Sequence, residues 1–327
     1  MVAIAADRDP AGFLPVSVAT IVPSTMVGVP LFIRVDNCPL PRLYRGSEYP
    51  LAESDLDDLL ARGVTTLHIR LIHYHRYQEY IRQSLPELLT DPSVPMARRF
   101  EALNHVARDV LQEIFRCKSV EQAVAQADAF GKHVVRLMNS DEFVATHLLQ
   151  VICHDYHTFT HSVNVAYFTI ALARGLGFRD DAELEQLAAG ALLHDVGKLR
   201  IPDAVLTKPG RLSDDEYEIV QTHPTIGFDT LCHRENLSFA QLMMVYQHHE
   251  RPDGRGYPVG VIDNEIAVWA KLCSVADVFE ALTSNRPYRP AMSLGEALST
   301  MQRQAGRALD EDMLTCWIEI IRNASPT

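Results

Sequence analysis

The chain has 327 residues, of which 47% are hydrophobic and 22% charged, and 42 Asp and Glu stand against 30 Lys and Arg. This composition excludes a disordered or fibrous chain, and the formal charge of −12 excludes binding to extended nucleic acid, which needs a basic surface. No apolar run reaches the length of a membrane helix, so membrane insertion is not expected. Scattered cysteines without a CxxC pair, and an N-terminus without a signal-peptide pattern, favour the cytoplasm.

The first 85 residues alternate short β-like runs with turns. Residues 16–22, 31–35 and 64–69 are rich in aliphatic and β-branched side chains, so each run predicts a strand. Ser54 predicts the N-cap of a short helix that ends at Gly63. The expected surface histidines of this region are His68, His73 and His75. We expect a small α/β module over residues 1–85, with a role in regulation or dimerisation.

Beyond this module the pattern is helical. Prolines in residues 86–95 predict a linker, and apolar residues at helical spacing predict a helix over 97–115. Further N-caps are predicted at Ser119, Ser140, Ser213 and Ser293. We therefore expect linker and coupling helices over residues 86–140 and an all-α domain over 141–327, which makes the whole chain α+β.

Eight of the 14 histidines lie between residues 154 and 249, several of them beside carboxylates in apolar helical segments. His157 and His161 are four residues apart, so on a helix their side chains share a face. An apolar helix then delivers His194 and Asp195 as neighbours, with Lys198 one turn later. The remaining members of the set are His223, His248, His249 and Asp277.

Each of these residues taken alone is more simply explained as a satisfied core or surface residue. The dipeptide His154-Asp155 shows how common a lone pair is, since it lacks the apolar helix and the following lysine. The co-occurrence of imidazoles and carboxylates in successive helices instead predicts a metal site. Nitrogen and oxygen ligands without a thiolate favour Fe, Mn or Ni over a thiolate zinc site.

The set holds more ligands than one ion needs, so two divalent metal ions that share a carboxylate are predicted. Two such ions can convert a bridging water into hydroxide and stabilise both oxygens of an in-line displacement at phosphorus. Lys198 would then neutralise charge on the phosphoryl oxygens or assist the leaving oxygen.

These residues lie in motifs that resemble the HD-GYP domains of the HD phosphohydrolase superfamily, over about residues 150–322. The motifs are HTFTHSVNV, ALLHDVGKLRIPDAVLTKPGRLS, HPTIG, HHERPDGRGYP and ADVFEALTSNRPYR. The resemblance implies a helical domain with divalent metals, Fe or Mn first and Ni or Zn as alternatives. It also implies an enzyme of bacterial second-messenger signalling that hydrolyses cyclic di-GMP to linear pGpG and, in some members, to GMP.

Carried over position by position, the resemblance gives the metal ligands His161, His194, Asp195, His223, His248, His249 and Asp277. It makes Asp195 the bridging ligand and places Lys198 beside the attacked phosphate, so these two form the catalytic pair. Substrate contacts are implied for the loop of Gly256, Tyr257 and Pro258 and for the cations Arg286 and Arg289. The alternatives are a plain turn for the loop and surface salt bridges for the arginines.

His157 stands where family members with three metals have a glutamate. An imidazole can bind a metal but cannot bridge in a bidentate way, so His157 is a further candidate ligand that argues against a third metal. The choice between pGpG and GMP as final product stays open.

We expect a cytoplasmic, metal-dependent cyclic di-GMP phosphodiesterase that works as a homodimer or with a signalling protein partner. Two alternatives stay open. One is a catalytically weak cyclic-dinucleotide sensor or scaffold, which would bind its ligand without turnover. The other is an HD phosphohydrolase acting on another cyclic dinucleotide, because pocket shape rather than metal chemistry selects the substrate.

Overall fold

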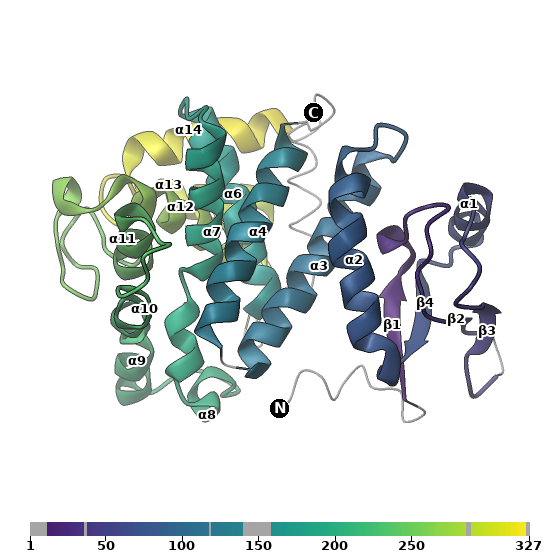
Figure 1. Cartoon of the computed structure of the whole chain (residues 1–327). Coiled ribbons are helices and arrows are strands. Elements are labelled where there is room, and N and C mark those ends of the chain that lie inside the picture. The colour runs from purple at the N-terminus through teal and green to yellow at the C-terminus, as the bar shows by residue number, and fades with distance from the viewer. Residues whose placement is uncertain (1–11, 36–37, 118, 140–157, 286–288, 325–327) are drawn as a thin grey trace. The chain divides into compact units, whose positions relative to one another are not determined.

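The computed structural model describes residues 12–35, 38–117, 119–139, 158–285 and 289–324. The chain divides into two compact units, Met1–Asp109 and Val110–Thr327. The first unit carries a small antiparallel sheet and the second is helical, so the predicted α+β fold class is confirmed (Figure 1). No helix within the described ranges is both long enough and apolar enough to cross a membrane.

The first unit is built on a sheet whose described strands have the order β1-β4-β2-β3. Its elements are β1 (Phe13–Ser17), β2 (Leu31–Ile33), β3 (Arg42–Arg45), α1 (Glu53–Ala61), β4 (Thr66–Arg70), α2 (Tyr74–Thr90) and the first part of α3 (Met96–Cys117). β1 and β4 pair antiparallel, with Phe13 opposite Arg70, and β2 joins the other side of β4 where Phe32 faces His68. β3 pairs antiparallel with β2 and completes the sheet.

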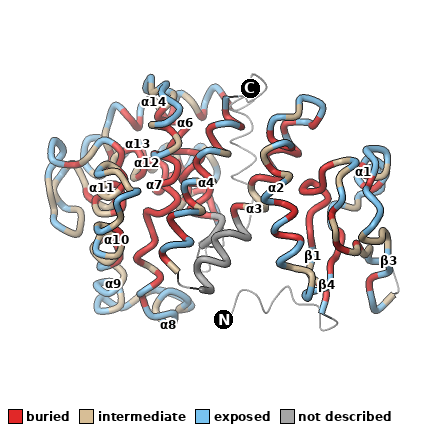
Figure 2. Tube along the Cα trace, in the orientation of Figure 1, coloured by how far each residue is buried: buried red, intermediate tan, exposed pale blue. Residues whose placement is uncertain are grey.

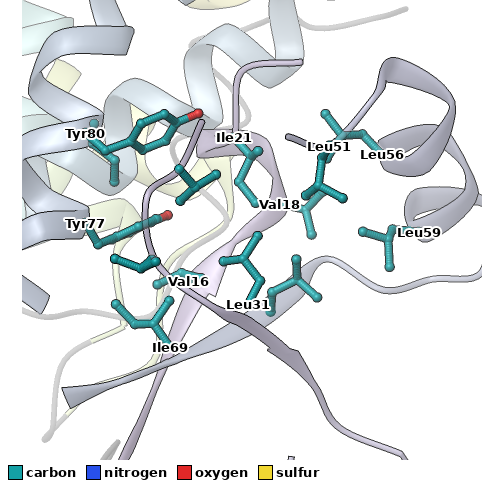
Figure 3. Packing of buried hydrophobic residues seen from close by; sticks show 14 residues of the cluster. Val16, Val18, Ile21, Leu31, Leu51, Leu56, Leu59, Ile69, Tyr77 and Tyr80 are labelled. Carbon is teal, nitrogen blue, oxygen red and sulfur yellow. The ribbon is translucent and has the colours of Figure 1, made fainter. Parts of the chain in front are cut away.

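An apolar core joins one face of this sheet to α1 and α2 (Figure 3). Val16 and Ile69 extend into this core from β1 and β4, and Leu56 and Leu59 of α1 are fully buried in the same core. A fully buried leucine stabilises a fold by about 1.5–3 kcal/mol, so these contacts rather than helix propensity hold α1 in place. Tyr77 of α2 closes the core from the helical side.

Several expectations for the first unit need correction. α1 begins after Ala52 rather than Ser54, because the Asp55 carboxylate accepts the backbone N–H of Ala52 at 2.9 Å and also pairs with Arg45 at 2.7 Å. The predicted strand over residues 16–22 turns into a 3₁₀ helix at Val18. His68 was expected at the surface but is only 8% exposed.

Pro86 lies inside α2, although the sequence predicts a linker there. A proline in a helix interior costs about 3 kcal/mol because it removes one hydrogen bond and crowds the preceding turn. Leu85, Leu88 and Leu89 are all buried on α2, and their burial is large enough to offset that cost. The helix therefore continues to Thr90.

The second unit is built from helices. Its elements are α4 (Val120–Met138), α6 (Thr158–Gly175), α7 (Asp181–Leu193), the 3₁₀ helix η3 (Val196–Arg200), α8 (Asp203–Leu206), α9 (Asp214–Gln221), α10 (His223–Leu231), α11 (Phe239–Gln247), the 3₁₀ helix η4 (Asp263–Glu265), α12 (Val268–Thr283), α13 (Leu294–Gln302) and α14 (Glu311–Ala324). The N-caps expected at Ser119, Ser213 and Ser293 are confirmed, and the one expected at Ser140 lies outside the described residues.

α7 is the buried centre of the second unit, since every residue from Leu187 to Leu193 is buried (Figure 2). It contacts α4, α6 and α11, and α6 and α11 in turn contact α12. Gly131 of α4 allows a close approach, because a Cβ there would lie 2.3 Å from the backbone oxygen of Glu185. This packing brings the end of α7 next to the candidate ligands on the surrounding helices.

Candidate metal centre

The candidate ligands lie within or at the ends of helices in the second unit. α7 ends at Leu193, and His194 and Asp195 follow in the turn that leads into η3. His223 is the first residue of α10, and His248 directly follows α11. His161 lies in the interior of α6, and Asp277 lies in the interior of α12. Segments far apart in the sequence therefore meet around one buried point.

Close backbone packing sets the position of Asp195. Gly197, two residues after Asp195, lies against the start of α10. A Cβ added to Gly197 would be 2.0 Å from the backbone oxygen of His223. Any larger residue would push η3 away from α10, so glycine is required for this contact. Asp195 and His223 are thereby held side by side.

The Asp195 carboxylate lies between two groups of histidines. Its Oδ2 is 3.6 Å from Nε2 of His161 and 3.4 Å from Nε2 of His194. Its Oδ1 is 3.2 Å from Nε2 of His223 and 3.9 Å from Nε2 of His248. A carboxylate with one oxygen toward each group has the arrangement that a ligand shared by two metal ions requires.

Three of these histidines are oriented in the same way by a backbone carbonyl of the preceding turn. Nδ1 of His194 lies 2.6 Å from the carbonyl oxygen of Ala191. Nδ1 of His223 lies 2.7 Å from that of Val220, and Nδ1 of His248 lies 2.9 Å from that of Val245. A carbonyl oxygen only accepts, so each Nδ1–H donates and each Nε2 keeps its lone pair. Metal-binding histidines have this tautomer when Nε2 is the ligand atom.

Acidic side chains surround His161. We call His161, Asp277 and Glu280 the carboxylate-rich half of the site. Nε2 of His161 is 3.3 Å from Oδ1 of Asp277, and its Nδ1 is 2.5 Å from Oε2 of Glu280. Burial alone would lower the pKa of His161, but Glu280, Asp195 and Asp277 raise it well above its usual value. This half therefore strongly favours positive charge.

His223, His248 and His249 form the imidazole-rich half of the site. The ring centroids of His248 and His249 are 4.2 Å apart, and those of His223 and His249 are 5.0 Å apart. Burial lowers the pKa of His248 well below its usual value and that of His249 to about 3. The rings of His248 and His249 are therefore neutral at physiological pH, and the neutral form is the one that binds metals.

The donor set fits divalent metal ions. Ligand atoms within 4.8 Å of one another occur in two groups of the described residues, one with His161, His194 and Asp195, the other with Asp195, His223, His248 and His249. The buried atoms His194 Nε2 and Asp195 Oδ1 have no hydrogen-bond partner within the described part of the chain. Leaving a buried polar atom unsatisfied costs about 1–3 kcal/mol, so their arrangement points to a cation as partner.

Lys198 lies beside this centre. Its Nζ is 2.5 Å from Oδ2 of Asp195, and its side chain is partly exposed. Burial would raise the pKa of Asp195, but the charge of Lys198 and the side-chain contact with His161 hold it well below its usual range. Asp195 is therefore ionised, and Lys198 lies between the carboxylate and solvent.

The loop of Gly256, Tyr257 and Pro258 folds back over the imidazole-rich half. The Tyr257 ring stacks on His249 with centroids 4.7 Å apart. A Cβ on Gly256 would lie 2.5 Å from Cα of Glu250, so only glycine fits here. The buried Glu250 carboxylate accepts the backbone N–H of Val259 at 2.7 Å and that of Gly260 at 3.0 Å. This anchoring holds the loop at the edge of the metal centre.

Three expected residues are not placed at the centre. His157 and Arg286 lie outside the described residues. The guanidinium of Arg289 donates to the backbone carbonyls of Ala281 and Leu282 near the end of α12. A phosphate-binding role for Arg289 therefore stays a prediction.

Two glutamates of the site did not emerge from the sequence. Glu280 contacts His161 across 119 residues of chain, and Glu250 anchors the loop that follows it. A signal existed in both cases, because each is an acidic residue in an otherwise apolar or ligand-bearing segment. Glu280 lies three residues after Asp277 on α12, and Glu250 directly follows His249. A buried charge of this kind requires a partner.

The helical unit and its histidine–aspartate cluster define a known class of protein. The chain belongs to the HD domain family, whose model matches residues 150–313. Proteins of this family are metal-dependent, in agreement with the cluster around Asp195. The resemblance inferred from the sequence motifs is confirmed.

Individual relatives are similar over part of their length. The chain is 35% identical to the cyclic di-GMP phosphodiesterase PA4108 of Pseudomonas aeruginosa over 206 residues, which cover 61% of this chain and 49% of that protein. It is 38% identical to the 3'3'-cGAMP-specific phosphodiesterase 3 of Vibrio cholerae over 156 residues, covering 48% of this chain and 34% of the relative. The chain thus spans about half or less of the length of these curated relatives.

A solved structure has the same fold. Bd1817, an HDG"Y"P protein from Bdellovibrio bacteriovorus, aligns with a TM-score of 0.67 over 95% of this chain and 99% of that chain. The two sequences are 19% identical, so the similarity concerns the fold alone.

Proposed function

We propose that this protein is a metal-dependent phosphodiesterase that hydrolyses cyclic di-GMP to linear pGpG, and further to GMP if both linkages are cut. The observation that carries the proposal is the Asp195 carboxylate, which directs one oxygen toward each histidine group and lies beside Lys198. The name of the Pseudomonas relative supports cyclic di-GMP as the substrate.

Two divalent ions, Fe or Mn in preference to Ni or Zn, are the proposed cofactors. His161, His194 and Asp277 would hold one ion and His223, His248 and His249 the other, with Asp195 shared. When bound, such ions supply Lewis acidity and a water of lowered pKa. A third ion is not proposed, because the position that would have to supply its glutamate is His157.

The chain's own residues then bind and orient the substrate. Water adds to one phosphorus and the bond from that phosphorus to O3′ breaks, which opens the ring and leaves a 5′-phosphate. Lys198 is placed to neutralise charge on the phosphoryl oxygens as it develops. Tyr257 presents its ring at the edge of the centre, where it can pack against a guanine base.

We further propose a regulatory role for residues 1–85, coupling through 86–140, and catalysis by 141–327. Every metal-ligand candidate lies in the last of these segments, which supports the division. A soluble nucleotide as substrate supports a cytoplasmic location, with a homodimer or a signalling protein as the expected partner.

The direct test incubates Mn²⁺-loaded or anaerobically Fe²⁺-loaded full-length protein with cyclic di-GMP and follows products by chromatography. We expect pGpG to form, and Asp195→Ala to abolish both turnover and metal retention. No linear product from protein with measured, filled metal sites would contradict the proposal. Binding of cyclic di-GMP without turnover would instead support a sensor.

A second candidate substrate is 3'3'-cGAMP, because one relative is named for its hydrolysis. Both dinucleotides present the same phosphodiester groups to the metal centre and differ in one base. A competition assay with equal concentrations of the two measures the ratio of their kcat/KM values. We expect kcat/KM to be higher for cyclic di-GMP than for 3'3'-cGAMP. The opposite order would make 3'3'-cGAMP the preferred substrate.

A further inference from the structure

One histidine of the candidate metal centre is oriented differently from the three whose Nδ1 bonds to a backbone carbonyl of the preceding turn. His194, His223 and His248 each direct Nδ1 to the carbonyl oxygen three residues earlier in the chain. Nδ1 of His161 instead lies 2.5 Å from Oε2 of Glu280, a carboxylate supplied by another helix. His161 therefore has an anionic partner where the others have a neutral one.

Glu280 is itself fixed in place. Its side chain is buried on α12, and Oε1 accepts a hydrogen bond from Ser284 Oγ at 2.6 Å and another from Asn164 Nδ2 at 3.3 Å. Ser284 lies one turn after Glu280, and Asn164 lies one turn after His161 on α6. With both oxygens occupied, the carboxylate lies behind the ring of His161 and does not turn toward Asp195.

We infer that Glu280 is a positioning residue that fixes the ring of His161 and increases the electron donation of its Nε2 to a metal ion in the carboxylate-rich half. The inference rests on the proposed metal centre. Carboxylates behind metal-bound histidines act in this way, and their removal usually weakens metal binding by about 10- to 100-fold. Glu280 contacts His161, so it should strengthen the binding only of the ion that His161 holds. The two metal positions should therefore differ in affinity.

A rival explanation is that Glu280 only joins α6 to α12 through its hydrogen bonds. The two explanations differ in whether the negative charge of Glu280 affects metal affinity. Glu280→Gln keeps the size of the side chain and most of its hydrogen bonds but removes the negative charge. Ser284→Ala removes one hydrogen bond to Oε1 and leaves the charge beside His161 intact, which makes it the matched control.

The test measures Mn²⁺ binding to the full-length wild type and to both variants, by the EPR signal of free Mn²⁺. We expect Glu280→Gln to weaken one of two classes of site by about 10- to 100-fold. Ser284→Ala should change either class by less than about threefold. Glu280→Asp, which restores the charge, should recover part of the lost affinity. Unchanged binding in Glu280→Gln, or equal weakening in both variants, would overturn the inference.

A second measurement needs no variant. In Zn²⁺-loaded wild-type protein, the Nδ1 proton of His161 should resonate further downfield than those of His194, His223 and His248, because it donates to a carboxylate. Equal shifts for all four would overturn the inference. Wild-type protein that binds neither metal would overturn the proposed function itself, whereas normal binding with equal shifts would overturn only the role of Glu280.

Discussion

The two halves of the metal centre use the same ligand type in opposite electrostatic settings. In the carboxylate-rich half, His161 lies between Asp277 and Glu280. In the imidazole-rich half, His223, His248 and His249 lie close together, and the carboxylate oxygen that faces His223 and His248 comes from Asp195. The two settings show how one fold surrounds neighbouring histidines with different charges, as the proposed pair of metal ions would require.

The contrast extends to the protonation of the metal-free protein. The carboxylates raise the pKa of His161 well above its usual value, although burial opposes them. Burial lowers the pKa of His249 to about 3. In the carboxylate-rich half, the His161 ring therefore compensates the negative charge of the carboxylates. In the imidazole-rich half, the His249 ring stays neutral and keeps a lone pair. Asp195 has one oxygen toward each half, which is why it is proposed as the shared ligand.

The largest effect is expected from Asp195→Ala. Because both halves share this carboxylate, the variant should lose both ions and lower kcat/KM by about 1,000-fold or more. Metal content by mass spectrometry and product formation from cyclic di-GMP would be measured together. Asp195→Asn, which keeps the size of the side chain, is the control for packing. A variant that kept two ions would contradict the shared role.

Removing one ligand from each half should separate the halves. His161→Ala should lose the ion of the carboxylate-rich half and His249→Ala the ion of the imidazole-rich half, with about one ion per chain left in each. Turnover should fall by more than about 100-fold in both, since even the loss of a partner behind a ligand costs 10- to 100-fold. Mn²⁺ titrations would count the remaining sites. Loss of both ions from either variant would mean that the halves do not bind independently.

A smaller effect is expected from Lys198→Met. Lys198 contacts Asp195 but is not one of the candidate ligands, so the metal content should stay at the wild-type level. Loss of a positive charge that stabilises the transition state should lower kcat by about 100-fold. Single-turnover kinetics with metal-loaded protein would test this. If metal is lost in parallel with activity, Lys198 acts on the centre rather than on the phosphate.

The smallest effect is expected from the loop. Gly256→Ala must displace the loop, because its Cβ would lie 2.5 Å from the backbone nitrogen of Arg251. Metal content should not change, while kcat/KM should fall by about 10- to 100-fold through misplacement of the substrate. Gly295→Ala on α13, where a Cβ meets no atom within 4 Å, is the matched control and should behave as the wild type.

The sequence predicts local features of this molecule well. The N-caps at Ser119, Ser213 and Ser293 depend on residues three positions apart, and the motifs around His194 and His248 contain their ligands within a few residues. Such short-range patterns need no knowledge of the tertiary fold.

Features that depend on distant contacts were not predicted. α2 continues through Pro86 because leucines on both sides of it are buried, and burial cannot be read from the sequence alone. β3 was missed because its segment, RLYR, lacks an apolar run and is defined by pairing with β2. Glu280 was missed for the same reason, since its partner His161 lies 119 residues away.

Anomalous diffraction from crystals of the Mn²⁺-loaded full-length protein tests the central claim most directly. The account predicts two Mn²⁺ peaks per chain, one beside His161 and one beside His223 and His249, with the Asp195 carboxylate between them. A single peak, or two peaks that do not share Asp195, would contradict it.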